Sequence, residues 1–125
     1  MENKGITAEA KFVYDATVMG LTVNIPIDDK NPYDFVTELN GTLNRVQVKS
    51  ARKEKNGSYK VTTSRGYKKK VLYTKEDIDF FAINLEDWDG WMIIPVLAID
   101  KITTTIRLTD KRYVGVYMDR WDLLS

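Results

Sequence analysis

Residues 32–49 read PYDFVTELNGTLNRVQVK, two runs rich in β-branched and aromatic residues on either side of Asn40-Gly41. Asn-Gly between such runs predicts a β-hairpin with a two-residue type I′ turn, because both residues tolerate the positive φ that this turn requires. If these two residues form the turn, counting outward pairs Phe35 with Val46. The pattern therefore predicts not only a hairpin but also its register.

Side chains alternate between the two faces of a strand, so the register also sorts the residues of the hairpin. One face is apolar and is expected to belong to the core: Tyr33, Phe35, Val46 and Val48. The other face carries a carboxylate, an amide and an ammonium group, with the first two directly opposite each other: Asp34, Gln47 and Lys49. A polar face can be the solvated side of a hairpin or a chemical site, and the hairpin alone leaves both interpretations open.

The composition limits the chemistry of any such site. The chain has 125 residues, no cysteine and no histidine. This length predicts a single domain over residues 1–125, and the missing residue types exclude disulfides, thiolate and imidazole ligands, and histidine catalysis. A metal site would use oxygen ligands, which favour Mg²⁺, Mn²⁺ or Ca²⁺. No apolar run is long enough for a membrane span, and a cytoplasmic location is expected.

Charges are segregated along the chain although the net charge is only +1. From Lys49 to Lys75 there are ten Lys and Arg residues and one acid, whereas residues 76–100 hold seven acids and no Lys or Arg. A basic segment next to an oxygen-rich site is typical of a protein that binds a polyanion. The residues predicted to bind nucleic acid are Arg52, Lys53, Lys55, Lys60, Arg65, Tyr67, Lys68, Lys69 and Lys70, with Tyr59 and Tyr73 as further candidates for stacking on bases or hydrogen bonding to phosphates.

Residues 4–19 have the pattern of a helix that Asn3 begins and Gly20 ends. The spacing of the apolar residues predicts a buried stripe of Ile6, Ala10, Val13 and Thr17. Glu9 lies on or beside this stripe, where a carboxylate is costly unless it is paired or binds a metal.

The arrangement of Asp34 followed by Gln47-Val48-Lys49 resembles the PD-(D/E)xK nuclease motif. Further segments resemble the group I intron-associated branch of that superfamily. These segments are Lys4-Gly5, Glu9-Ala10, Arg45 to Lys49, Tyr73 to Ala82, and Ile94-Pro95. Gln47 in place of the usual acid departs from the general motif and matches this branch.

The resemblance implies an α/β, restriction-endonuclease-like fold, with a central mixed sheet, flanking helices and an αβββαβ core. It also implies a metal-dependent DNA endonuclease of the homing or mobile-element type, encoded by a bacterium, an archaeon or a phage. Mg²⁺, or Mn²⁺ as a substitute, would be held by Glu9, Asp34, Gln47 and the carbonyl of Val48. The catalytic residues would be Glu9, Asp34, Gln47 and Lys49, and the loss of one formal charge at Gln47 should weaken metal affinity.

Double-strand cleavage needs two active sites, so a homodimer or homotetramer on double-stranded DNA is expected. Three other functions remain open at this point. They are a structure-selective nuclease such as a Holliday junction resolvase, an inactive DNA-binding module of the same fold, and a protein-interaction domain.

The remaining segments predict elements with structural roles. Asp28 and Asp29 are expected to form a turn, and Asn56-Gly57 a second hairpin turn. Thr74 is expected to cap a short helix, with Asp77 and Asp79 as hydrogen-bonding residues rather than ligands. Strands are expected over residues 80–85 and 91–95, and a terminal helix over residues 113–124.

Overall fold

The computed structural model describes residues 4–62, 64–65, 71–85, 89–99, 105–108 and 113–125. Its elements are α1 (Lys4–Val18), β1 (Thr22–Asn24), β2 (Phe35–Leu39), β3 (Thr42–Lys53), β4 (Tyr59–Thr62), β5 (Ser64–Arg65), β6 (Val71–Leu72), β7 (Phe80–Leu85), β8 (Trp91–Pro95), η1 (Val96–Ala98), β9 (Thr105–Leu108), α2 (Gly115–Tyr117) and η3 (Trp121–Leu124). Within these ranges, no helix is long and apolar enough to cross a membrane.

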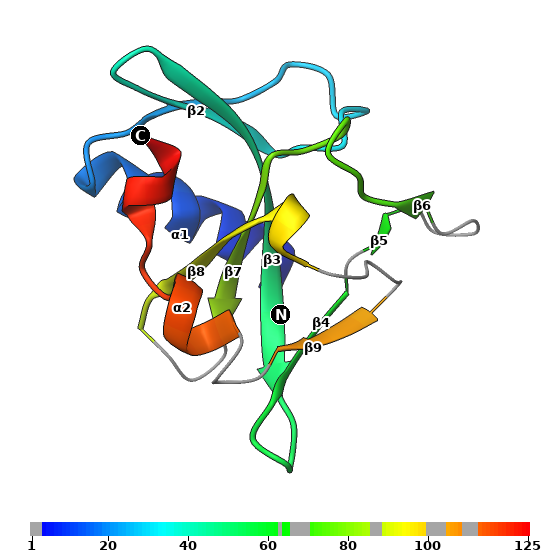
Figure 1. The fold of residues 1–125 in the computed structure, drawn as a ribbon. Helices are drawn as coiled ribbons and strands as arrows, with labels where there is room; N and C mark the ends of the chain where they lie inside the picture. The colour runs from blue at the N-terminus through cyan, green and yellow to red at the C-terminus, as the bar shows by residue number, and fades with distance from the viewer. Residues whose placement is uncertain (1–3, 63, 66–70, 86–88, 100–104, 109–112) are drawn as a thin grey trace.

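The long strand β3 is the centre of a seven-stranded mixed sheet (Figure 1). Its first half pairs antiparallel with β2, residues Val46–Ala51 pair parallel with β7, and its last two residues pair with β4. β1, β8 and β9 extend the sheet, and β5 and β6 form a separate two-stranded ribbon. The predicted mixed sheet is confirmed, and β3 connects all its parts.

The central hairpin has the predicted turn and register. Asn40 has φ 52° and Gly41 has φ 82°, as a type I′ turn requires. Phe35 pairs with Val46, as predicted from the turn. The second predicted hairpin is also present, because β3 and β4 pair antiparallel on either side of Asn56-Gly57. In its turn the Gly57 N–H donates to the Glu54 carbonyl, and Gly57 has a positive φ.

α1 covers one face of the sheet, and the C-terminal segment lies beside it (Figure 1). Phe12 is fully buried, with its ring centroid 5.6 Å from that of Phe35, 5.4 Å from Trp91 and 5.8 Å from Trp121. A second cluster fills the opposite face. It contains Phe81 and other residues of β4, β7, β8 and β9, together with Tyr73 from the segment before β7. Two cores of this kind hold the sheet between them.

The buried stripe of α1 differs from the prediction. Ala8, Phe12 and Ala16 are buried, whereas Ala10 and Thr17 are exposed and Val13 is half-buried. The helix therefore presents two small residues and one aromatic ring to the sheet. It ends as predicted, with Gly20 at φ 91°. The predicted cap Asn3 and the burial of Ile6 lie outside the described residues.

Three further expectations are corrected. Tyr33 does not share the face of Phe35, because β2 begins only at Phe35 and the Tyr33 side chain packs against the opposite core. The helix expected after Thr74 is a turn, although Asp77 caps it as predicted by accepting the Thr74 N–H at 3.0 Å. The expected terminal helix is two short helices with a break at Asp119, whose φ is 53°.

Candidate active site

Asp34 lies directly before β2 and is fixed against β3. Its backbone N–H donates to the Val46 carbonyl at 2.9 Å, and its Oδ2 accepts the Val48 N–H at 2.8 Å. The carboxylate thus takes the position that a strand carbonyl would have if the ladder continued. The regular pairing with β3 ends at Phe35, and the side chain of Asp34 is held beside the segment that carries Gln47.

Gln47 and Lys49 occupy alternate positions on β3, in the part of the strand that pairs with β7. In the parallel register they are paired with Phe81 and Ile83. Both side chains are half-buried, whereas Val48 between them is buried in the core under α1. The Gln47 Nε2 lies 3.4 Å from the Val48 carbonyl oxygen, a long hydrogen bond. Val46 and Val48 belong to the core under α1, as predicted. The opposite face is not purely polar, because Ala51 and the strand partners Phe81 and Ile83 on it belong to the second core cluster.

Glu9 and Asp34 interact electrostatically across the end of the hairpin. Burial, followed by the negative charge of Asp34, raises the pKa of Glu9. Burial also raises the pKa of Asp34, and this effect exceeds the opposing effects of the Val48 N–H bond and the Lys49 charge. The structure thus brings together Glu9, Asp34 and Lys49 from α1, the start of β2 and β3. Two partly buried carboxylates with raised pKa values are typical of a cation-binding site.

The donor atoms fit a hard divalent cation. The chain has no His or Cys, so the available ligands are the oxygens of Glu9, Asp34, Gln47 and the Val48 carbonyl. Among the described residues there is no group of three or more His, Cys, Asp or Glu side chains that could hold a metal.

Lys49 has an aromatic neighbour that the sequence analysis did not connect with it. Its Nζ lies 5.2 Å from the centroid of the Tyr73 ring. Tyr73 is only 3% exposed, and Tyr59 is equally buried, so neither ring is available to stack on a base. The stacking role predicted for these two tyrosines is therefore wrong. Tyr67 lies outside the described residues.

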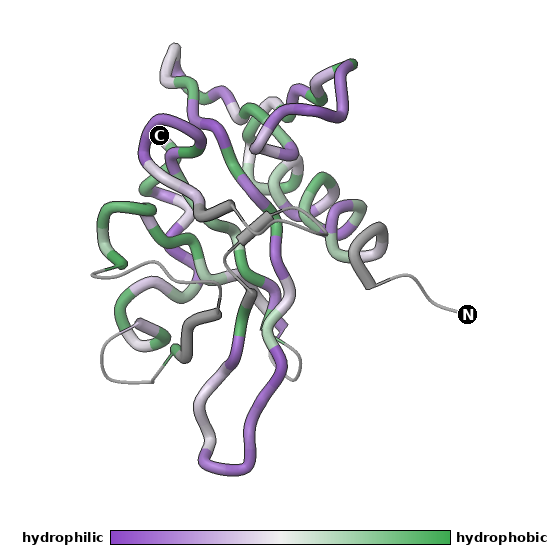
Figure 2. The backbone as a smooth tube through the Cα atoms, turned by 90° about the vertical axis from the view of Figure 1, so that its right-hand side faces the viewer, coloured by the Kyte–Doolittle hydropathy of each residue, from purple (hydrophilic) through white to green (hydrophobic). Residues whose placement is uncertain are grey.

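A basic hairpin formed by the end of β3 and the start of β4 projects from the sheet (Figures 1 and 2). Arg52, Lys53 and Lys55 are exposed there, and Lys60 is half-buried. The tube is strongly hydrophilic at the tip of this hairpin (Figure 2). Of the other residues predicted to bind nucleic acid, Arg65 has a described backbone in β5, and Lys68, Lys69 and Lys70 lie outside the described residues.

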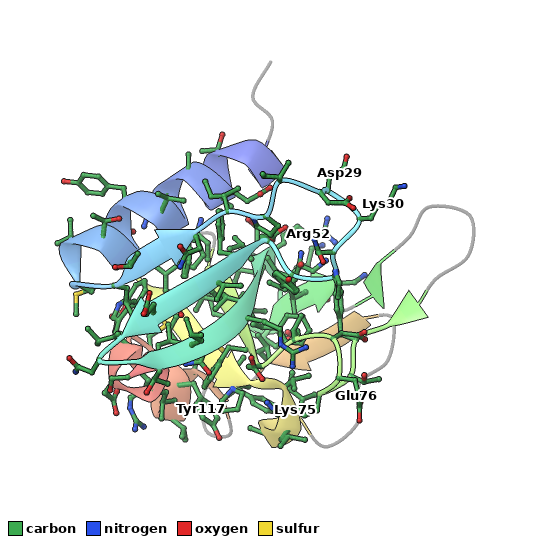
Figure 3. The ribbon with its side chains drawn as sticks, turned by 90° about the horizontal axis from the view of Figure 1, so that it is seen from above. Asp29, Lys30, Arg52, Lys75, Glu76 and Tyr117 are labelled. Atoms are coloured by element: carbon green, nitrogen blue, oxygen red, sulfur yellow. The ribbon has the colours of Figure 1, made fainter. Side chains whose placement is uncertain are left out.

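The acids that were expected to have structural roles do have them. The Asp28 Oδ1 accepts the Lys30 N–H at 2.8 Å and closes a turn in the β1–β2 loop, from which Asp29 and Lys30 project outward (Figure 3). Asp79 forms an ion pair with Arg45 at 3.2 Å and a second one with Lys75.

A cavity of about 270 Å³ lies beside the candidate site. Glu9 contributes its polar wall, and the rest of its lining is apolar: Ala10, Val13, Ile25 and Phe35. Glu9 therefore has a carboxylate near Asp34 and an open space next to it. Both features agree with a site at the surface end of the hairpin rather than inside the core.

The family is established by comparison with known proteins. A model described as PD-(D/E)XK endonuclease matches residues 1–121. The chain therefore belongs to the PD-(D/E)XK endonuclease family. Nucleases of this family act on DNA and generally use divalent metal ions. The family predicted from the sequence is thus confirmed.

Two solved structures are similar to the chain. A bacterial homing endonuclease, I-Ssp6803I, is 31% identical, with a TM-score of 0.79 over 96% of this chain and 89% of that chain. The Holliday junction resolvase Hjc of Archaeoglobus fulgidus is 13% identical, with a TM-score of 0.67 over 98% of this chain and 96% of that chain. The second likeness shows the fold alone, and together they confirm the restriction-endonuclease-like fold. No curated protein matches the chain.

Proposed function

We propose that this protein is a Mg²⁺-dependent, site-specific endodeoxyribonuclease of the homing type. The proposal rests mainly on the hydrogen bond from the Val48 N–H to the Asp34 Oδ2. This bond fixes Asp34, the first acid of the motif, against β3, which carries Gln47 and Lys49. The 31% identity to a bacterial homing endonuclease supports the homing type over other nucleases of this fold. The domain is proposed to comprise the whole chain, residues 1–125.

The proposed metal ligands are the side chains of Glu9, Asp34 and Gln47 and the carbonyl of Val48. Mg²⁺ held by these residues would lower the pKa of a bound water and neutralise phosphate charge. Asp34 is preorganised for its role because the Val48 N–H fixes its Oδ2, and Glu9 contributes the second negative charge from α1. Mn²⁺ also prefers oxygen ligands and is expected to substitute.

Lys49 provides the positive charge of the proposed site. Its ammonium is close enough to lower the pKa of Asp34. From this position it can donate a hydrogen bond to the attacking water, or to a phosphate oxygen on which charge develops during hydrolysis. Either role needs the ammonium to point toward Asp34, and neither can be performed by alanine.

The projecting β3–β4 hairpin is proposed to contact double-stranded DNA. Its positive charge comes from Arg52, Lys53, Lys55 and Lys60. A two-stranded ribbon of this kind is narrow enough to enter the major groove of DNA. The predicted basic residues Arg65 and Lys68 to Lys70, together with Tyr67, would extend this contact. Binding through phosphates should weaken steeply as salt increases.

The active form is proposed to be a homodimer or a homotetramer. A single protomer has one candidate site, whereas a break in both strands requires two. A symmetric assembly would place two such sites on related half-sites of the target. Sedimentation velocity with and without a DNA duplex measures the order of this assembly.

The test is cleavage of three substrates with Mg²⁺ or with EDTA: supercoiled plasmid, a library of random duplexes and a four-way junction. Wild type is compared with Lys49→Ala, and with Lys30→Ala as a control that removes an exposed lysine from the β1–β2 loop. Metal-dependent cleavage that Lys49→Ala abolishes and Lys30→Ala retains is the expected result. Preferred cutting of one library sequence supports the homing type.

Two other outcomes would change the proposal. Cleavage restricted to the four-way junction would make the protein a structure-selective nuclease like the archaeal resolvase that shares its fold. Salt-sensitive DNA binding without cleavage of any substrate would make it a binding module that has lost activity.

A further inference from the structure

The Tyr73 ring lies under the ammonium of the proposed catalytic lysine. The Lys49 Nζ is 5.2 Å from the ring centroid, within the distance at which a cation is attracted to an aromatic face. Tyr73 is 3% exposed, so little water competes for this contact. Its environment is aromatic as well, because the Phe81 ring meets it edge to face, with centroids 5.4 Å apart and planes at 89°.

Two features fix the position of the Tyr73 ring: its contact with Phe81 and the turn that follows Tyr73 in the chain. Phe81 is on β7 and pairs with Gln47 in the parallel register, so the ring packs beside the same part of β3 that carries the motif. The backbone after Tyr73 is closed into a turn, in which the N–H groups of Asp77 and Ile78 both donate to the Thr74 carbonyl. Ile78 is completely buried and anchors that turn.

A lysine needs such a support if it is to act at a defined point. Its side chain has four rotatable bonds and loses rotamer entropy when it is fixed. Gln47 and Lys49 are only half-buried, so packing alone does not hold the ammonium. A fixed aromatic face below the ammonium limits the positions that the ammonium can take.

We propose that Tyr73 is a positioning residue that holds the Lys49 ammonium toward Asp34 through the face of its ring. The inference rests on the proposed nuclease function and goes beyond it, because Tyr73 is outside the motif. The ring, rather than the hydroxyl, performs this role. Tyr73→Phe should therefore retain the positioning of Lys49, and Tyr73→Leu should lose it.

The chain provides a matched control. Tyr59 is also 3% exposed, belongs to the same core cluster, and lies under a lysine, with the Lys53 Nζ 6.0 Å from its centroid. Tyr59→Leu therefore removes an equally buried ring and an equivalent lysine contact without touching Lys49. Any loss that comes only from a weakened core should be the same in Tyr59→Leu and Tyr73→Leu.

The experiment measures single-turnover cleavage at saturating enzyme, at a temperature where every variant is folded by circular dichroism. Tyr73→Leu should lower the cleavage rate constant about 10-fold, the order expected for a desolvated cation–π contact. Tyr73→Phe should restore it to within about twofold of wild type, and Tyr59→Leu should leave it unchanged. The enzyme concentration that gives a half-maximal single-turnover rate should not change in either Tyr73 variant.

Equal rates for Tyr73→Leu and Tyr73→Phe, with wild type active, would overturn the positioning role and leave the nuclease function intact. An equal loss in Tyr59→Leu and Tyr73→Leu would overturn it as well, because the effect would then be structural. A wild type that cuts no substrate would instead overturn the proposed function and this inference with it.

A second measurement covers the case in which Tyr73→Leu does not fold. In protein labelled with ¹³C at lysine Cε, the Lys49 signal is assigned by its disappearance in Lys49→Arg. Protons above an aromatic face are shifted upfield, so the Lys49 Hε signal should be upfield in wild type and in Tyr73→Phe. A Lys49 signal at the position of exposed lysines such as Lys30 would overturn the inference.

Discussion

Asp79 connects the two central parallel strands, and Asp79→Asn is expected to destabilise the fold in a pH-dependent way. Its Oδ2 accepts the Arg45 backbone N–H at 2.8 Å and the Arg45 Nε at 3.2 Å, and Lys75 forms a second ion pair with it. Its own N–H donates to the Arg45 carbonyl at 2.9 Å. Burial acts to raise the pKa of Asp79, but the bonds from Arg45 and Lys75 overcome it and lower the pKa from 3.8 to about 2.

The magnitude follows from this shift. The Asp79 side chain is 15% exposed, so screening by solvent is limited. A lowering of nearly two pKa units corresponds to about 2.4 kcal/mol of stability. Because the folded pKa is below the unfolded one, this stability is fully present above about pH 5 and is lost as the pH falls through the folded pKa. About 1.3 kcal/mol should remain at pH 3.

The assay is urea unfolding of wild type and Asp79→Asn from pH 7 to pH 3, followed by tryptophan fluorescence. The difference in unfolding free energy should be about 2 kcal/mol or more at pH 7 and should shrink by roughly 1 kcal/mol at pH 3. Asp29→Asn, which changes an exposed acid on the β1–β2 loop, is the control for the removal of a surface carboxylate. A constant difference for Asp79→Asn across this range would refute the reasoning.

Three further predictions concern single positions. Thr37→Val should stabilise the protein by about 1 kcal/mol in thermal unfolding, because the Thr37 Oγ1 is buried and lacks a hydrogen-bond partner among the described residues; a lower melting temperature would contradict this. Gly90→Ala should lower the stability by about 1–3 kcal/mol in the same assay. A Cβ at this position would lie 2.6 Å from the Asp119 Oδ1, which accepts the Trp91 N–H, and an unchanged stability would contradict this. Gln47→Glu should lower the Mg²⁺ concentration for half-maximal cleavage, because it adds a third negative charge to the site, and an unchanged Mg²⁺ requirement would argue against Gln47 as a ligand.

The parts that could be predicted from sequence are those that local chemistry determines. Asn40-Gly41 requires a type I′ turn, the turn sets the register, and the register places Gln47 and Lys49 on the face opposite Val48. The end of α1 at Gly20 follows from the same kind of local rule. These predictions needed no information about distant residues.

The parts that failed depend on contacts between distant segments. The stripe of α1 was wrong because the helix turns Phe12 toward Trp91 and Trp121, far away in the sequence. The terminal helix breaks at Asp119 because its carboxylate accepts the Trp91 N–H and its own N–H donates to the Trp91 carbonyl. Tyr73 was interpreted as a base-stacking residue, since nothing in the local pattern shows that it is buried under Lys49.

Gln47 also determines the charge that the proposed site presents to DNA. With both carboxylates ionised, Glu9, Asp34 and Lys49 sum to one negative charge, and one bound Mg²⁺ changes this to one positive charge. An acid at position 47 would make the loaded site neutral. In the proposed site, the glutamine would thus give weaker metal binding but a loaded site that attracts a phosphodiester. Gln47→Glu should therefore tighten Mg²⁺ binding while it weakens DNA binding in the presence of Mg²⁺, and a tightening of both would contradict this account.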